Sequence, residues 1–510
     1  MVTTGRTGRI ARRLLDALRR DWLGWRAAAG RLLPVRPGLF AYDVYPPGGR
    51  RRIHLRIESD GSGVLLVDVT DAIHLNPTAA LMARLALEKV PADRAAVVLR
   101  AHFRGVEPAL LRRQSARIYA LVEHLATTTA ACSTCGRDEL ARTPLFSTPV
   151  RAPYKADLAL TYGCNNACPH CYNQPQRAAM RSLSPRDWNR VLGKLARVGV
   201  PHVIFTGGEP TLFDDLTRLI DRARRLGLVA GLNTNGRRLA DRPFVESLAR
   251  AGLNHVQITL GSHRPEVHNA MTAADSFLET TGGIENSLAA GLHTITNTTL
   301  TRQNAGHAEQ IVEFLHAQGL RTFAFNGMIY SGGGRTSREA LAEADMAAVL
   351  VAVRDRAAEL GMRFLWYTPT AYCRLSPVEL ELGPRRCNAA EYSVCIEPNG
   401  DVLPCQSYYS AAGNILRDRW ATIWRSDLFR SFRHRVADPR GCGLPEACWQ
   451  CPDLPLCAGG CRIEREHANC GIHGRENEAA PFSPADSPKL MAERPEATAD
   501  DPLLTAQEGW

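Results

Sequence analysis

Three closely spaced cysteines are the first candidates for chemistry in this sequence: Cys164, Cys168 and Cys171, in a CxxxCxxC pattern. Thiolates at this spacing on one loop can bind three irons of a 4Fe-4S cube and leave the fourth iron without a protein ligand. The alternative is a structural zinc site, but zinc sites favour paired CxxC or Cys/His spacing and four ligands. The pattern therefore favours an iron–sulfur cluster with one open iron, at which chemistry can occur.

A second group of cysteines lies later in the chain. Cys387 is followed after twelve residues by Gly400 and, after four more, by Cys405. Four further cysteines, separated by two, five and three residues, are Cys448, Cys451, Cys457 and Cys461, and a last thiol follows at Cys470. Thiols in such a set indicate metal ligation, by iron–sulfur clusters or by a zinc ribbon. Three other features remain open: Cys395 and Cys442 fit no spacing and are expected to be buried or solvent thiols, and the isolated pair Cys132 and Cys135 has no assigned role.

The elements that position the first cysteine loop follow from the alternation of short apolar segments and helical patterns after Lys155. Strands are expected at 157–162, 202–206, 228–233, 255–260, 293–300 and 322–327, with helices at 183–198, 214–226, 242–251, 277–290, 305–318 and 338–360. Six strand–helix units imply parallel strands with right-handed crossovers. The cysteine loop directly follows the first strand, so the site is expected where the strands end.

Glycine and short polar residues follow the other strands. Gly207, Gly208, Glu209 and Pro210 come after the second strand, where glycines let a backbone approach a ligand closely and Glu209 offers an anionic acceptor suited to an ammonium group. Side chains suited to hydroxyl or carboxylate groups end the later strands: Asn233, Thr234, Asn235, Thr259, Ser262, Asn297 and Asn326. Ordinary turn formation or strand capping is the alternative role for each of them.

The cysteine loop and the GlyGlyGluPro segment together resemble the radical S-adenosylmethionine (SAM) enzymes. The resemblance implies an α/β fold with a partial (β/α)6 barrel of TIM type, in which the open iron binds the amino and carboxylate groups of SAM. One electron then cleaves SAM to a 5′-deoxyadenosyl radical, and GlyGlyGluPro meets the methionyl amino group. Two positions depart from the common pattern: Thr259 to Ser262 reads ThrLeuGlySer in place of Ser-x-Asp-Gly, and His170 replaces an aromatic residue.

The second cysteine group resembles the SPASM extension of the same enzymes at every spacing. That resemblance implies two auxiliary 4Fe-4S clusters. By position, Cys387, Cys405 and Cys461 would bind the first auxiliary cluster, and the second would be held by Cys448, Cys451, Cys457 and Cys470. An upstream eighth ligand is often present, and Cys373 is the candidate; without it the first auxiliary cluster would have an open iron.

The region before the barrel has a different pattern. Short alternating strands are expected at 40–45, 52–57 and 63–69, with an AspGly turn between the last two. Asn76 can cap a helix that starts at Pro77, and helices follow at 92–104 and 108–127. This region resembles the PqqD-like precursor recognition element, a winged-helix α+β module to whose sheet edge a leader peptide adds as a strand. A nucleic-acid-binding winged helix or a purely structural domain is the alternative.

Length and charge set broader bounds. The 510 residues predict two or three domains, and the net charge of +10 would suit an acidic partner or reflect an Arg-rich composition alone. Fifteen cysteines with no secretory signal and no apolar run of membrane-spanning length, about 20 residues, favour a cytoplasmic metal-binding protein. We expect six parts along the chain: a basic amphipathic segment (1–36), the peptide-binding domain (37–127), a linker with CxxC (128–153), the radical SAM core (154–368), the SPASM domain (369–470) and a disordered tail (471–510).

Together these resemblances imply a radical SAM iron–sulfur oxidoreductase that matures a ribosomally made precursor peptide. It would bind the peptide through its leader, receive electrons from a flavodoxin or ferredoxin, and form a thioether or carbon–carbon crosslink; no nucleic-acid partner is expected. Three alternatives remain: modification of tetrapyrrole side chains, maturation of a sulfatase, and an iron–sulfur sensor that binds DNA.

Overall fold

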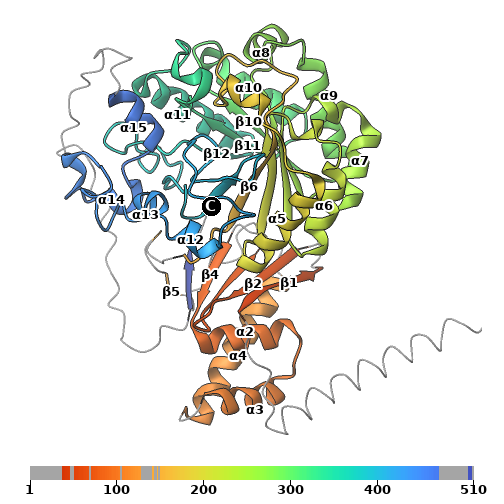
Figure 1. The fold of residues 1–510 in the computed structure, drawn as a ribbon, viewed down its shortest axis with the longest axis vertical. Helices are drawn as coiled ribbons and strands as arrows, with labels where there is room; N and C mark the ends of the chain where they lie inside the picture. The colour runs from red at the N-terminus through yellow and green to blue at the C-terminus, as the bar shows by residue number, and fades with distance from the viewer. Residues whose placement is uncertain are drawn as a thin grey trace, which may run out of the picture. The chain divides into compact units, whose positions relative to one another are not determined.

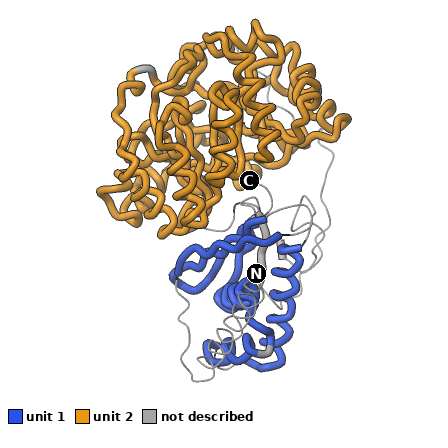
Figure 2. Tube along the Cα trace, turned by 90° about the vertical axis from the view of Figure 1, so that its right-hand side faces the viewer, with its two compact units in different colours: residues 1–148, 496–510 blue, residues 149–495 orange. Residues whose placement is uncertain are grey.

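The computed structural model describes residues 37–45, 51–67, 71–103, 106–127, 141–142, 146, 150–469 and 504–507. The chain divides into two compact units, residues 1–148 with 496–510 and residues 149–495 (Figure 2). The expected amphipathic segment, the pair Cys132 and Cys135, and Cys470 lie outside the described residues.

The first unit contains a sheet in the order β1-β2-β3-β4-β15-β5. Its first four strands form an antiparallel meander: β1 (Gly38–Val44), β2 (Arg51–Ile57), β3 (Gly63–Val67) and β4 (Asp71–Leu75). The predicted AspGly turn joins β2 to β3, and Gly61 has a φ of +87°, which favours glycine. The Asp60 carboxylate accepts a hydrogen bond from the Ser62 amide at 3.1 Å and fixes the turn.

Three helices follow the meander: α2 (Pro77–Leu87), α3 (Ala92–His102) and α4 (Pro108–Thr127). The Asn76 side chain accepts a hydrogen bond from the Ala79 amide at 2.8 Å, which confirms the predicted cap. Buried residues of β2, β3, β4 and the helices form one core, which includes Ile53 and Leu121. The sheet is completed by β5 (Ala141–Arg142) and by β15 (Leu504–Gln507).

β15 corrects one expectation, because the tail at 471–510 was expected to be disordered throughout. The tail's composition cannot form a core of its own. Four residues can nevertheless join an existing sheet, because the ladder needs only their main-chain groups.

The second unit contains a nine-stranded sheet in the order β12-β11-β10-β9-β8-β7-β6-β13-β14. Figure 1 labels its strands β6, β10, β11 and β12. Its central strands match the six predicted ones: β6 (Lys155–Thr161), β7 (His202–Gly207), β8 (Val229–Thr234), β9 (His255–Thr259), β10 (His293–Thr299) and β11 (Thr322–Asn326). All neighbouring pairs among them are parallel, as predicted.

Helices lie between these strands along the chain, and each has a buried apolar side. They are α5 (Pro185–Val198), α6 (Leu216–Arg225), α7 (Arg242–Ala251), α8 (Pro265–Thr272), α9 (Phe277–Ala289), α10 (Ala308–Ala317) and α11 (Glu343–Glu359). The short helix α8 was not predicted. Three strands extend the sheet beyond the predicted six: β12 (Arg363–Trp366), β13 (Ser393–Ile396) and β14 (Val402–Leu403).

The rest of the second unit has short helices separated by loops: α12 (Trp420–Trp424), α13 (Asp427–Arg433), α14 (Leu454–Cys457) and α15 (Arg462–Asn469). This is the region of the second cysteine group. No helix in the described part of the chain combines the length and apolar character that crossing a membrane would require.

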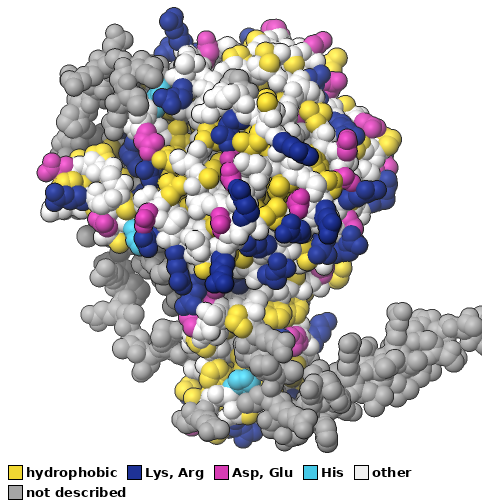
Figure 3. All heavy atoms as spheres, viewed as in Figure 1, with side chains coloured by type: hydrophobic (Ala, Val, Ile, Leu, Met, Phe, Trp, Pro, Cys, Tyr) yellow, Lys and Arg dark blue, Asp and Glu magenta, His cyan; other side chains and the backbone are white. Residues whose placement is uncertain are grey.

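Basic side chains of the second unit are interspersed with acidic ones on the face shown in Figure 3. Several arginines on the helices pair with acids three or four residues away, such as Arg190 with Asp187 and Arg242 with Glu246. Such exposed pairs each contribute little stability, about 0–1 kcal/mol. Part of the Arg-rich composition is therefore accounted for by ordinary helix surfaces.

Candidate active site

The first cysteine loop begins where β6 ends, as predicted, and holds three free thiols. Cys164 is exposed, and Cys168 and Cys171 are partly buried. Burial raises the pKa of the Cys168 thiol, and the nearby Cys171 and Cys164 raise it further. A cationic iron group would stabilise all three thiolates, because a bound metal deprotonates a coordinating thiol. The donor set therefore fits a cluster held by three cysteines.

Gly207 and Gly208 bring the β7 loop into direct backbone contact with the cysteine loop. The Gly208 amide donates to the Thr161 carbonyl at 2.7 Å, and the Glu209 amide donates to the Gly163 carbonyl at 2.9 Å. A Cβ atom would lie 2.1 Å from the Thr161 oxygen at Gly207 and 2.3 Å from the Gly163 oxygen at Gly208. These glycines were expected to let a ligand approach; in the structure their close contacts are with the end of β6 and the start of the cysteine loop.

Glu209 is fully buried, and its carboxylate accepts four hydrogen bonds from the protein. The donors are the Thr211 amide at 3.0 Å and hydroxyl at 2.6 Å, the Thr234 hydroxyl at 2.7 Å and the Asn235 amide at 2.8 Å. Burial raises the pKa of Glu209, and these hydrogen bonds act in the opposite direction. The side chain thus connects the turn that starts at Pro210 to the end of β8, while its contact with an ammonium group stays a prediction.

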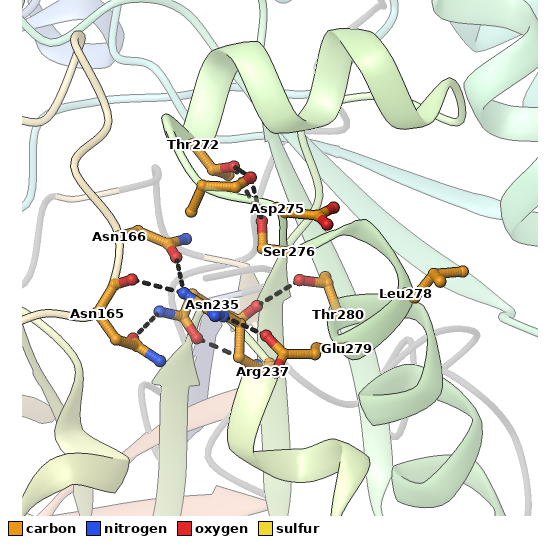
Figure 4. Close-up of polar contacts among 12 residues, drawn as sticks. Asn165, Asn166, Asn235, Arg237, Thr272, Asp275, Ser276, Leu278, Glu279 and Thr280 are labelled. Carbon is orange, nitrogen blue, oxygen red and sulfur yellow. Dashed lines mark hydrogen bonds and ion pairs between the residues drawn. The ribbon is translucent and has the colours of Figure 1, made fainter.

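Asn235 and Arg237 reach from the end of β8 to the cysteine loop (Figure 4). The side-chain nitrogen Nδ2 of Asn235 donates a hydrogen bond to the side-chain oxygen of Asn165 at 2.7 Å. Arg237 donates to the Asn165 carbonyl at 2.5 Å and to the Asn166 side chain at 3.1 Å, and it forms an ion pair with Glu279 of α9. Sequence reasoning missed Arg237 and Glu279; the only available signal was the position of Arg237 just after the predicted AsnThrAsnGly segment.

Helix α8 and the turn that precedes it, both after β9, also contact the cysteine loop or stabilise that contact. The Ala167 amide donates to the carbonyl of Thr272, the last residue of α8, at 3.0 Å. Buried His268 of α8 accepts a hydrogen bond from the Gly261 amide at 3.1 Å through Nδ1. Ser262 is buried, accepts from the Arg264 amide at 3.1 Å and contacts Nε2 of His307 at 3.1 Å. Ser262 therefore fixes this turn, one of the two roles considered for it.

Asn297 has the features expected of a ligand contact. It lies on β10 in register with Thr259 of β9. Its side-chain oxygen is buried and, among the described residues, finds no hydrogen-bond partner. A buried acceptor without a donor costs about 1–3 kcal/mol, so a hydroxyl or amino group of a ligand would stabilise it. Asn326, by contrast, donates to the Gly327 carbonyl at 2.7 Å.

Two glycines that the sequence analysis did not identify close over the end of the cysteine loop. The Gly333 amide donates to the Cys171 carbonyl at 2.8 Å, and a Cβ at Gly332 would lie 2.5 Å from the Asn173 oxygen. The Tyr409 hydroxyl adds contacts at 3.0 Å to the Tyr172 carbonyl and to the Asn173 side chain. The run of three glycines after the sixth strand was the available signal.

The later thiols act on one another electrostatically. Burial raises the pKa of Cys405, and Cys387 and, more weakly, Cys461 raise it further, while their shared cluster stays a prediction. Burial also raises the pKa of Cys448, followed by effects of Cys457, Cys373 and Cys451. Cys395 is buried in β13 and Cys442 is partly buried.

Two thiols act electrostatically on Cys373, those of Cys457 and Cys451. Its thiol pKa is raised by burial, lowered by Arg374 and raised by Cys457 and Cys451. The amide of its neighbour Tyr372 lies 3.4 Å from the Cys457 sulfur. The assignment of Cys373 to the first auxiliary cluster stays a prediction; Cys457 and Cys451 are the thiols that act on it here.

Comparison with known proteins identifies both regions. Residues 158–315 match the Radical SAM superfamily, and residues 387–452 match the SPASM iron–sulfur cluster-binding domain. A PqqA peptide cyclase of Xanthomonas campestris pv. campestris is 31% identical over 389 residues, which are 70% of this chain and 99% of that protein. Mycofactocin maturase MftC of Mycobacterium ulcerans is 30% identical over 362 residues, 69% of this chain and 94% of that protein.

A solved structure shares the fold. Streptococcus suis SuiB bound to its precursor peptide SuiA superimposes with a TM-score of 0.60 at 18% identity. The match covers 81% of this chain and 94% of SuiB.

Proposed function

The chain belongs to the radical SAM/SPASM family that includes the PqqA peptide cyclases, and we propose that it is a peptide maturase of this family that crosslinks a ribosomally made precursor. The observation that carries the proposal is the cysteine loop, whose three free thiols are held by residues from β7, β8, α8 and the turn at Gly332–Arg335. When bound, the cluster and SAM supply a 5′-deoxyadenosyl radical that abstracts a hydrogen atom from carbon.

The residues of this chain position the reactants. Glycine contacts and the Asn235 and Arg237 hydrogen bonds fix the loop, so the three thiolates are held in place before the cofactor binds. Asn297, whose buried side-chain oxygen has no partner among the residues that the structure describes, is proposed to accept a hydrogen bond from SAM, and Thr259 and Asn233 are proposed to line the same site. Holding the reacting groups in place before the reaction lowers its entropic cost.

The later thiol groups are proposed to hold two auxiliary 4Fe-4S clusters. Crosslinking removes two hydrogen atoms from the peptide, one by the radical and the second as a proton and an electron. Clusters held by these thiols would supply an acceptor for that electron, and a flavodoxin or ferredoxin is the proposed external donor. Cys387, Cys405 and Cys461 would hold the first of these clusters, and Cys448, Cys451, Cys457 and Cys470 the second. Cys373, whose neighbour Tyr372 contacts the Cys457 sulfur, is the proposed eighth ligand.

The first unit is proposed to be a PqqD-like module that binds the leader of the precursor. An antiparallel sheet followed at once by three helices supports this assignment, as does the capped start of α2 at Pro77. Main-chain hydrogen bonds to a sheet edge would supply affinity, and side-chain pockets would supply specificity.

The test is made on protein purified and reconstituted without oxygen. Iron and sulfide per chain are measured first, followed by release of 5′-deoxyadenosine from SAM with dithionite. About twelve irons, four for each of three cubes, and release that disappears in Cys164→Ala are expected. Cys395→Ala is the matched control, because this thiol belongs to neither group and release should persist. Zinc in place of iron, or no release, would contradict the proposal.

A further inference from the structure

The C-terminal strand β15 occupies a specific place in the sheet of the first unit. It pairs antiparallel with β4, with Leu504 opposite Leu75 and Gln507 opposite Ala72. Figure 1 draws this strand in blue beside the orange β4. On its other side it pairs in parallel with β5, where Thr505 lies opposite Ala141. A segment from the end of the chain thus fills the position between two strands from near the beginning.

The edge that β15 covers is suited to accept an extended peptide. β4 is the last strand of the meander, with β3 on one side and β15 on the other. Without β15, the main-chain groups on that other side of β4 would have no partner strand among the described residues. Such an edge is a template for strand addition. The strand itself is held firmly, because Ala72, Ile73 and Leu75 are buried and the Asn76 cap starts α2 directly after it.

Charge favours the same pairing. Residues 471–510 contain eight acidic and three basic residues, whereas residues 37–127 contain twelve basic and nine acidic ones. The tail and the module therefore carry net charges of opposite sign, which favours their association. The paired segment itself, LeuThrAlaGln, is uncharged and contains no proline that would remove a ladder donor.

We propose that Leu504–Gln507 of the same chain is a built-in competitor that occupies the β4 edge, where the proposed function would place the incoming peptide. Naming the incoming ligand as a precursor peptide rests on the proposed function; the occupation of the edge by the tail does not. A tethered segment acts at an effective concentration of about millimolar, so an incoming peptide must outcompete it. A longer ladder with side-chain pockets would displace the four residues of β15.

The competition has a structural consequence for the empty enzyme. An uncovered sheet edge can pair with another chain and lead to aggregation. The tail would cover this edge until a peptide with more contacts arrives. Weak peptides would be rejected, because their binding must first displace β15.

The probe is a fluorescent synthetic peptide with the sequence of residues 496–510, and its binding is followed by anisotropy. Four proteins are compared: the full chain, a chain ending at Pro495, and full chains carrying Ala506→Pro or Ala497→Pro. Proline at 506 removes a donor within the paired segment, whereas Ala497 lies outside it. The truncated chain and Ala506→Pro should bind the probe at least tenfold more tightly than the full chain and the Ala497→Pro control.

Hydrogen–deuterium exchange gives the second readout. The amides of 71–75 should be protected in the full chain, exchange at least tenfold faster in the truncated chain, and regain protection when the probe is added. Equal probe affinity for all four proteins, or equal exchange of 71–75 with and without the tail, would overturn the inference. Release of 5′-deoxyadenosine, measured separately on the full chain, tests the proposed function, so failure of one can be told from failure of the other.

Discussion

The two cysteine regions of the second unit are built in opposite ways. In the first, three thiols lie within one loop, and hydrogen bonds from the segments after β7 and β8, from α8 and from the Gly332–Arg335 turn fix that loop. In the second, the thiols are spread from Cys373 to Cys461 among short helices and loops. Protein hydrogen bonds fix the first site, whereas the iron–sulfur clusters proposed for the second would add connections between segments that share few regular elements. Binding energy at such a site is also folding energy.

Removal of iron should therefore have the largest effect, and it should be confined to one region. Chelation of the reconstituted protein is expected to increase amide exchange across 405–461 by tenfold or more, while β6 to β11 and their neighbour β13 stay protected. The physical reason is that metal ligation contributes on the order of ten kcal/mol in small structural metal sites. Hydrogen exchange followed by mass spectrometry measures both regions in one sample. Equal loss of protection in the barrel strands would show that the two regions do not differ in this way.

Lowering the pH should reduce the free energy of unfolding through protonation of His268, which holds the turn beside the first cysteine loop. Its Nδ1 accepts the Gly261 amide, and burial lowers its pKa to about 4, from about 6.5 in an unfolded chain. The unfolded state therefore binds the proton first, and this contribution to stability is complete above about pH 6.5 and is lost as pH falls toward 4. Within that window the loss is up to about 1.4 kcal/mol per pH unit.

Urea unfolding between pH 7 and pH 4 checks this dependence. The His268→Asn variant should show a shallower decline than the original chain, because asparagine does not titrate. His316→Asn is the control, since that histidine lies at the end of α10, away from the loop. An unchanged slope in His268→Asn would contradict the assignment.

Gly208→Ala tests the backbone contact between the two motifs. Its Cβ would lie 2.3 Å from the Gly163 oxygen, so the loops must separate. We expect a loss of about 1–3 kcal/mol in the free energy of unfolding, measured by urea titration, and weaker iron retention. Gly306→Ala is the matched control, because nothing lies within 4 Å of a Cβ there. Equal stability of the two variants would show that the contact is not restrictive.

Arg237→Ala should have the smallest effect on stability and a clear effect on the loop. The Arg237 and Glu279 side chains are 21% and 47% exposed, so their ion pair contributes less than about 1 kcal/mol. Loss of the contacts to Asn165 and Asn166 should nevertheless release iron to a chelator several-fold faster, as followed by absorbance. Arg242→Ala, which breaks an exposed helix pair, should release iron at the original rate.

Much of this architecture could be predicted from the sequence because its signals are local. The six central strands, the Asn76 cap and the cysteine spacing each depend on neighbouring residues. The contacts of Arg237 with Asn165 and of Gly333 with Cys171 join segments far apart in sequence, and no local pattern specifies such pairs. Helix α8 was missed because it is only eight residues long. β15 was missed because its stability comes from its partner strand and not from its own composition.

Because β13 pairs with β6, the central sheet can be completed only after translation has reached β13. β6 carries the first cysteine loop, and its free side is completed in parallel register by Ser393–Ile396, with the Tyr392 carbonyl accepting the amides of Tyr154 and Lys155. The sheet around the loop is therefore incomplete until these distant residues leave the ribosome. At roughly 5–20 residues per second, that delay is on the order of ten seconds to a minute. During this interval the nascent chain exposes its cysteines beside an unpaired strand, so cluster-assembly factors and chaperones have a defined period in which to act.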